Sequence, residues 1–377
     1  MEIKQIYTIV NNALSESVGT SALLTEDLSN VVDAGNAIFD NNSFDAFSGK
    51  LVDHVGRMVF VDRKYSGFGY SLLRDGWEYG AVLQKVSSEI PKASQNESYQ
   101  LVNGATYDPH EFYGTPVDVK FYNKYVTFEI DKSITERQLK SAFSSANELN
   151  AFVSMIYNEI DKGFTVALAN LARRTLNNFM GEVINGGGSN AINLLTEYNA
   201  GPNAGGTPLV ANLALVDTEF LKFATFRILQ ASDRMTEIST LFNLGGKERF
   251  TPKDMQKIIL HTDFRSAADV YLQSGTFHNE FVRLPGGEST AYWQGSGTSF
   301  DPADTTAIDV TTTEGNSVSQ TGILGVIFDR DAIGINCMER WVRTQPNAKA
   351  DFTNYFYKMK AQYFNDFNEN MIVFYIA

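Results

Sequence analysis

Apolar residues recur every three or four positions through one uninterrupted stretch in the middle of the chain. They are Leu149, Phe152, Val153, Ile156, Ile160, Phe164, Ala167, Leu168, Leu171, Leu176, Phe179, Met180 and Val183. This spacing predicts one helix over residues 146–184, about 58 Å long at 1.5 Å per residue. Capping-box patterns at 133–136 and 145–148 precede it, and Gly186-Gly187-Gly188 follows it. Gly163 lies inside the pattern and favours a bend there.

Two shorter helical patterns come at the N-terminus. Ile3, Tyr7, Val10 and Leu14 fall on one face of the first, and a second apolar run follows between residues 23 and 32. Neither helix is long enough to bury its apolar face by itself. We therefore expect each to dock on the core of this chain or on a neighbouring subunit.

Alternating apolar and polar residues, typical of β-strands, occur at 117–121 and 126–130, and a further strand is predicted at 81–86. The polar stretch before residue 117 contains turn residues such as Asn103-Gly104. The pattern predicts an extended β-hairpin with a long tip. An isolated hairpin is marginally stable in water, so one of this length needs an external surface, which favours oligomerisation.

The second half of the chain mixes helices and strands. We expect a helix from Asp217, its N-cap, to about Arg234, then a buried strand at 258–261 and a short helix at 267–272. Residues 285–322 are rich in Gly, Ser and Thr, which suits surface loops or short edge strands.

The end of the chain returns to strands. They are predicted at 323–328, 356–363 and 371–376, and a loop is expected at 343–353, which contains Pro346. Together with the helices, these strands place the chain in the α+β class.

Composition narrows the class of protein. The 377 residues suggest two or three folding units, and a 43% apolar content allows a sizeable core. The single cysteine, Cys337, excludes a disulfide framework, and we expect it to be a buried small hydrophobe. Glu2 and Lys4 interrupt any signal-peptide pattern, and the uncharged stretch 198–216 contains two prolines, so we expect a soluble protein from a reducing compartment and no membrane partner.

The acidic balance argues against tight nucleic-acid binding. Lys plus Arg number 31 and Asp plus Glu 44, for a net charge of −13. Phosphate binding needs clustered cations, and Arg173-Arg174, the only adjacent basic pair, falls on a predicted helix, where a solvated or ion-paired face explains it better.

Motifs that carry chemistry are missing from the sequence. It has no phosphate loop, no HExxH, no C-x-x-C and no GxSxG, and its four histidines are scattered. Asp329-Arg330-Asp331 lacks the EF-hand spacing and is better explained as a turn held by local hydrogen bonds. Glu97, Asp108 and Glu111 fall on the hairpin tip, where no burial would shift a pKa. We therefore expect no catalytic residue, no metal and no cofactor.

Aromatic residues crowd the hairpin tip at Tyr99, Tyr107, Phe112 and Tyr113. Base stacking is one interpretation, but it normally requires a basic groove. Exposed tyrosines mark protein–protein contacts more often. We expect these four residues to contact another subunit.

In order and length, these elements resemble the major capsid protein of tailed bacteriophages, with the Hong Kong 97-type fold. The sequence likeness lies in the last 60 or so residues: 322–335 resemble the family's strand, Asp-Arg turn and next strand, and 355–363 with 369–376 resemble its closing strands.

The resemblance implies a division of the chain into subdomains. Residues 1–49 would be an N-terminal arm, 50–78 and 129–188 a peripheral domain with the spine helix, 79–128 an extended loop, 189–336 an axial domain, and 337–377 return strands.

It also implies where subunits meet. The arm residues Ile3, Tyr7 and Val10 would contact other subunits, as would Lys85 and Lys92 on the loop. Arg343 and Pro346 would lie near local three-fold contacts. No cross-linking chemistry can be transferred to either lysine, because no partner asparagine or catalytic acid is identified.

The implied function is a shell of hexameric and pentameric capsomers around the double-stranded DNA of a tailed phage. Its partners would be further copies of itself, a separate scaffolding protein, a portal protein, a minor capsid or decoration protein, and DNA through weak contacts. The protein would be made in the host bacterial cytoplasm and located in the virion. Two alternatives are an encapsulin shell around protein cargo, and a soluble carbohydrate-active or hydrolytic enzyme with a deep pocket and shifted carboxylates.

Overall fold

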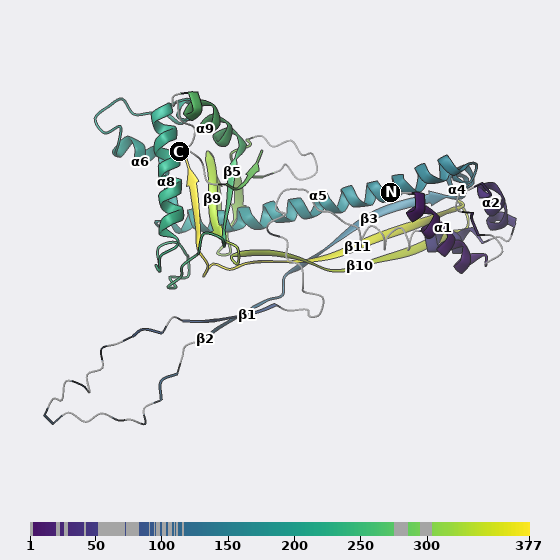
Figure 1. Cartoon of the computed structure of the whole chain (residues 1–377), viewed down its shortest axis with the longest axis horizontal. Coiled ribbons are helices and arrows are strands. Elements are labelled where there is room, and N and C mark those ends of the chain that lie inside the picture. Colours follow the sequence, from purple (N-terminus) through teal and green to yellow (C-terminus); the bar gives the residue numbers. More distant parts are fainter. Residues whose placement is uncertain are drawn as a thin grey trace. The chain divides into compact units, whose positions relative to one another are not determined.

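The computed structural model describes residues 3–19, 23–25, 29–40, 43–51, 72, 83–89, 117–274, 286–294 and 304–377, and single positions between 91 and 114 (91–93, 95, 99, 103–104, 108, 110 and 112–114). The chain forms two compact units. Unit 1 comprises Met1–Glu78, Tyr125–Arg174 and Ile335–Gln362, and unit 2 comprises Tyr79–Lys124, Thr175–Gly334 and Tyr363–Ala377. The labels of Figure 1 are used below.

Unit 2 is built on a five-stranded sheet in the order β4-β12-β9-β5-β6. Its strands are β4 (Ala191–Asn193), β5 (Gln256–His261), β6 (Glu288–Thr290), β9 (Ile323–Asp329) and β12 (Met371–Tyr375). The predicted strands at 258–261, 323–328 and 371–376 are thereby confirmed. Antiparallel neighbours flank β9, whereas β4 and β6 pair in parallel at the two edges.

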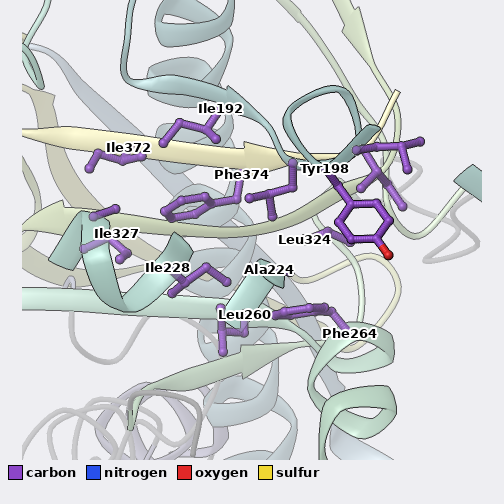
Figure 2. Close-up of a cluster of buried hydrophobic side chains, with 14 of the residues drawn as sticks. Ile192, Tyr198, Ala224, Ile228, Leu260, Phe264, Leu324, Ile327, Ile372 and Phe374 are labelled. Carbon is purple, nitrogen blue, oxygen red and sulfur yellow. The ribbon is translucent and has the colours of Figure 1, made fainter. Parts of the chain in front are cut away.

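Three helices cover one face of this sheet: α6 (Leu194–Ala200), α8 (Thr218–Arg234) and α9 (Thr262–Ser274). Their side chains form one buried cluster with the strand residues Leu260, Ile372 and Phe374 (Figure 2). The α8 helix begins as predicted, because the Asp217 carboxylate accepts the Phe220 N–H at 2.7 Å. This cluster is a hydrophobic core of unit 2.

Shorter elements complete unit 2. They are α7 (Ala211–Ala214), the paired strands β7 (Ile308–Thr311) and β8 (Ser317–Gln320), and the hairpin strands β1 (Leu83–Ser88) and β2 (Val117–Tyr122). The stretch 285–322 was expected to be surface loops or edge strands, yet Trp293 within it is fully buried. Its indole N–H donates to the Ile323 carbonyl at 2.9 Å.

Unit 1 contains a three-stranded sheet in the order β10-β11-β3. The strands are β3 (Tyr125–Thr135), β10 (Ile333–Asn347) and β11 (Phe352–Asn365), and β3 pairs antiparallel with β11 along eleven residues. The strand predicted at 126–130 therefore belongs to this sheet and not to the hairpin. Alternation identified it as a strand, but alternation does not specify a partner.

The predicted long helix is confirmed as α5 (Ala146–Gly186), which has 41 residues and belongs to unit 1 up to Arg174. The helix continues through Gly163. A Cβ at that position would lie 2.6 Å from Ile130 Cδ1 of β3, so the glycine allows helix and strand to approach closely.

The first predicted N-terminal helix is confirmed as α1 (Ile3–Ser17). The second was placed wrongly: residues 23–25 are not helical, because the Asn30 side chain binds the Leu23 carbonyl and the Thr25 N–H, and α2 spans Val31–Asp40. Val10 and Leu14 are fully buried within the chain. The Asn11 amide holds the backbone of Leu24 at both its N–H (2.7 Å) and its carbonyl (3.1 Å).

Two sequence expectations were wrong in detail. The loop expected at 343–353 is strand up to Asn347, because Pro346 lies on β10 at the edge of its sheet, where a missing N–H is tolerated. The first capping box is made not by Ser133 but by Thr135 with Gln138, at the start of α4 (Glu136–Ala142).

Cys337 also differs from its expected full burial. It is half-buried, because the burial of β10 falls off from this residue onward.

Candidate assembly interface

The β1–β2 hairpin of unit 2 turns an apolar face to solvent. Val86 and Val119 lie directly opposite each other in the antiparallel register and are 59% and 44% exposed. On the same face, Val117 and Phe121 are 54% and 64% exposed. Four large apolar side chains on one face of a two-stranded sheet form a patch that the described residues of the chain do not cover.

The opposite face of the hairpin is polar and half-buried. It carries Lys85, Ser87, Asp118, Lys120 and Tyr122, which alternate with the exposed residues along both strands. A sheet with one solvated face normally buries its apolar side and exposes its polar side. The hairpin has the reverse arrangement.

A compact charge cluster, the anchor, holds the base of the hairpin. Lys85 Nζ lies 2.6 Å from an Asp366 oxygen and 2.8 Å from a Glu369 oxygen, and Lys120 Nζ lies 2.8 Å from the other Asp366 oxygen. Asp366 is thus shared by one lysine from each strand. Burial opposes the charge on Asp366, but the two lysines outweigh it and lower the pKa of its carboxyl.

Three further ion pairs, here the outer pairs, lie farther along the hairpin. Lys247 Nζ contacts Glu89 at 2.9 Å and Asp118 at 2.8 Å, and Lys92 Nζ contacts Glu248 at 2.7 Å. The hydrogen bond from Lys247 lowers the pKa of Asp118, and the bond to Glu248 raises the pKa of Lys92. The polar, half-buried face of the hairpin, its inner face, is therefore held by ion pairs both at the base and farther out.

The residues predicted to contact other subunits fall into different environments. At the tip, Tyr99, Phe112 and Tyr113 are 85%, 91% and 79% exposed, whereas Tyr107 lies outside the described residues. Arg343 and Pro346 are exposed on the last part of β10. These five positions stay predictions as contact sites.

The other predicted contact residues are occupied within the chain or are not described in full. Val10 is fully buried and Tyr7 half-buried, while Ile3 begins α1 and its side chain lies outside the described part. Lys85 and Lys92 both form ion pairs with carboxylates of their own unit. The side chains of Lys85 and Lys92 are 23% and 76% exposed, and both residues stay predictions as contact sites.

The chemistry of an enzyme site is weakly represented. A pocket of about 440 Å³ in unit 2 is lined by Phe121, Tyr363 and other residues, but Glu182 is its only carboxylate. In the described part of the chain, Asp329 alone has a carboxyl pKa that is raised, and it does not line this pocket. The described residues include no group of three metal-ligating side chains and no helix long and apolar enough to cross a bilayer.

A family model settles which proteins the chain is related to. The model for Phi29-like phage major capsid proteins matches residues 6–375. The chain belongs to this family. No curated protein matches it.

Solved structures agree on the fold. A chain from the capsid structure of Staphylococcus phage Andhra has a TM-score of 0.50 at 12% identity, covering 84% of this chain and 86% of that one. Chains from bacteriophage P68 (TM-score 0.49, 10% identity, 84% and 86% covered) and cyanophage P-SCSP1u (0.46, 9%, 84% and 89%) are also similar. Only the first reaches a TM-score of 0.5, and at 12% identity it shows a shared fold and nothing more.

Membership of the Phi29-like capsid family confirms the resemblance to the major capsid proteins of tailed phages. This chain is a structural subunit of a tailed phage, its major capsid protein, and its place is the phage capsid. The encapsulin and enzyme alternatives find no support in the family match.

Sequence reasoning identified the hairpin but missed what holds it. Asp366 and Glu369 lie in the turn between β11 and β12, more than 240 residues from the lysines they bind. The sequence does carry a signal of this contact. Lys85, Asp118 and Lys120 occupy the half-buried face of the hairpin, where apolar residues would normally be found.

Proposed function

We propose that this capsid protein assembles through hexameric and pentameric capsomers into an icosahedral shell around the phage's double-stranded DNA. Its subdomains follow the Hong Kong 97-type division given above, and its role is structural rather than enzymatic. It is made in the host cytoplasm, acts with a separate scaffolding protein, a portal and a minor capsid or decoration protein, and touches DNA only weakly. The net charge of −13 supports this last point, since a genome must slide past the wall.

One observation carries the structural part of the proposal: the β1–β2 hairpin exposes Val86, Val117, Val119 and Phe121 to solvent. We propose that a second copy of the chain covers this face. Head-to-tail contacts between identical copies close into rings, which is the geometry of a capsomer.

The test replaces the facing pair with serine, in a Val86→Ser, Val119→Ser double variant. Both side chains are exposed in the single chain, so its stability should change by less than about 1 kcal/mol. Sedimentation velocity and negative-stain electron microscopy should show wild-type capsomers, sheets or shells, and a largely unassembled variant.

The matched control is Val270→Ser on α9, where the valine is 63% exposed but lies away from the hairpin. It should assemble like the wild type. A double variant that assembles as well as the control would remove the hairpin face from the proposal. A wild-type chain that stays monomeric in salt, with crowding agent and with phage scaffolding protein would contradict the capsomer proposal itself.

A further inference from the structure

Charged contacts join the hairpin to the rest of unit 2 at its base and farther out along its inner face. The anchor joins Lys85 and Lys120 to Asp366, with Glu369 as a second partner of Lys85. The outer pairs join Lys247 to Glu89 and Asp118, and Lys92 to Glu248. An aromatic contact adds to the anchor at the base of the hairpin, where the rings of Tyr122 and Phe364 lie 4.9 Å apart.

The carboxylates of the anchor are shielded from water. The Asp366 side chain is only 3% exposed and Glu369 13%, while Lys85 and Lys120 are 23% and 36% exposed. The backbone fixes Asp366 in place, because its N–H donates to the Ala332 carbonyl at 2.7 Å. Lys85 Nζ is also 3.3 Å from the Asp331 carbonyl, which adds a neutral acceptor to the two carboxylates.

The carboxylates of the outer pairs are open to solvent. Glu248 is 40% exposed beside Lys92 (76%), and Glu89 and Asp118 are 51% and 39% exposed beside Lys247 (29%). Salt shortens the screening length from about 10 Å at 0.1 M to about 3 Å at 1 M, and it weakens exposed pairs far more than buried ones. Two sets of contacts on one hairpin therefore differ in their response to the ionic medium.

We propose that the hairpin is a strap hinged at the anchor: Lys85, Lys120 and Asp366 stay closed while the outer pairs at Lys247 and Glu248 open and close. When the outer pairs open, the strands beyond the base change direction. The exposed apolar face of the hairpin changes its orientation with them. Because Asp366 binds one lysine from each strand, the two strands stay paired at the base and move together. The hinge is a property of the unassembled chain and does not depend on the capsomer proposal.

The test measures distances within unit 2 by pulsed electron paramagnetic resonance in the full-length protein, at a dilution where sedimentation velocity shows single chains. A reference spin label is placed at Glu237→Cys, which is exposed in unit 2, and a second at either Gln84→Cys near the base or Ser88→Cys near the outer pairs. Cys337→Ser removes the native thiol. Each pair is measured at about 0.05 M and about 1 M sodium chloride.

In the wild-type background we expect high salt to broaden the 237–88 distance distribution and to leave the 237–84 distribution unchanged. Lys247→Met should broaden 237–88 already at low salt and leave 237–84 narrow. Asp366→Asn should broaden both at low salt. Glu219→Gln breaks an exposed pair with Lys222 on α8, outside the hairpin, and should change neither distance.

Two results would overturn the hinge: a 237–88 distribution that is insensitive to salt and to Lys247→Met, or a 237–84 distribution that stays narrow in Asp366→Asn. If Asp366→Asn does not fold, Lys85→Met and Lys120→Met each remove one arm of the anchor and decide the second point in the same way. Since the protein is unassembled throughout, these results are separate from failure of shell formation.

Discussion

The backbones of Gly322 and Ile376 are in direct contact at one end of the unit 2 sheet. The N–H of Ile376 donates to the Gly322 carbonyl at 2.9 Å, and the Ile376 carbonyl occupies the space that a side chain at 322 would need. Gly322 also has φ of +69°, in the left-handed region. The strand that closes the chain therefore depends on a glycine directly before β9.

Gly322→Ala should destabilise unit 2 markedly. The alanine adds the cost of a left-handed residue, about 1 kcal/mol, to a collision with backbone that cannot swing away, for a total on the order of 2–4 kcal/mol. Gly315→Ala is the matched control, since Gly315 has φ of +88° and open space around it. Urea denaturation should show a small loss for Gly315→Ala and a much larger one for Gly322→Ala. Equal losses would mean that the contact with Ile376 is irrelevant.

Asp217→Ala should weaken α8 by about 1 kcal/mol, because the Phe220 N–H loses its acceptor at the helix N-terminus. Asp217→Asn keeps an oxygen in the same place and should lose only a few tenths of that amount. Thermal unfolding of the three proteins gives the comparison. If asparagine costs as much as alanine, the carboxylate charge and not the hydrogen bond stabilises this helix end.

How well the sequence predicted an element depended on how local its signal is. The period of α5 and the Asp217 cap of α8 are set by neighbours within four residues, and both were predicted correctly. The apolar run of β9, buried at every position, was equally clear. For such elements, tertiary contacts reinforce the local preference.

Non-local relationships were not predictable in the same way. The alternation at 126–130 identified a strand, but its partner β11 lies more than 200 residues away. Pro346 predicts a loop when read locally, because its tolerance within a strand depends on β10 being an edge strand, which is a property of the sheet. No role is predictable for Asp366 and Glu369, since nothing nearby in the sequence shows that two hairpin lysines reach them.

Asp366→Asn should lower the free energy of unfolding at neutral pH by about 1–3 kcal/mol, since two lysines lose their shared anion. The folded-state pKa of Asp366 is below its ordinary value of 3.8. Its contribution is therefore present above that value and lost as the pH falls through the folded-state pKa.

The measurement for Asp366 is a series of urea titrations from neutral to acid pH on the wild type and Asp366→Asn. The gap between them should be largest near pH 7 and close in acid. Glu219→Gln, from an exposed pair, should give a gap of less than about 0.5 kcal/mol at every pH. A gap that stays constant into acid would mean that the side chain acts by packing and not by charge.

Asp329 should show the opposite dependence on pH. Its carboxylate accepts the Thr251 hydroxyl at 2.8 Å and the Asp331 N–H at 2.7 Å, but it is only 3% exposed, and burial raises its pKa above 3.8. A raised folded-state pKa gives stability that is complete below the unfolded-state pKa and is lost as the pH rises through the folded-state pKa.

Asp329→Asn keeps an oxygen for the Asp331 N–H but loses the hydrogen bond to Thr251, which costs on the order of 1 kcal/mol. In the same titrations, the variant should therefore compare better with the wild type near pH 7 than in acid. If the variant instead loses more stability relative to the wild type as the pH rises, the ionised carboxylate stabilises this turn. Its two hydrogen bonds would then outweigh the cost of burying its charge.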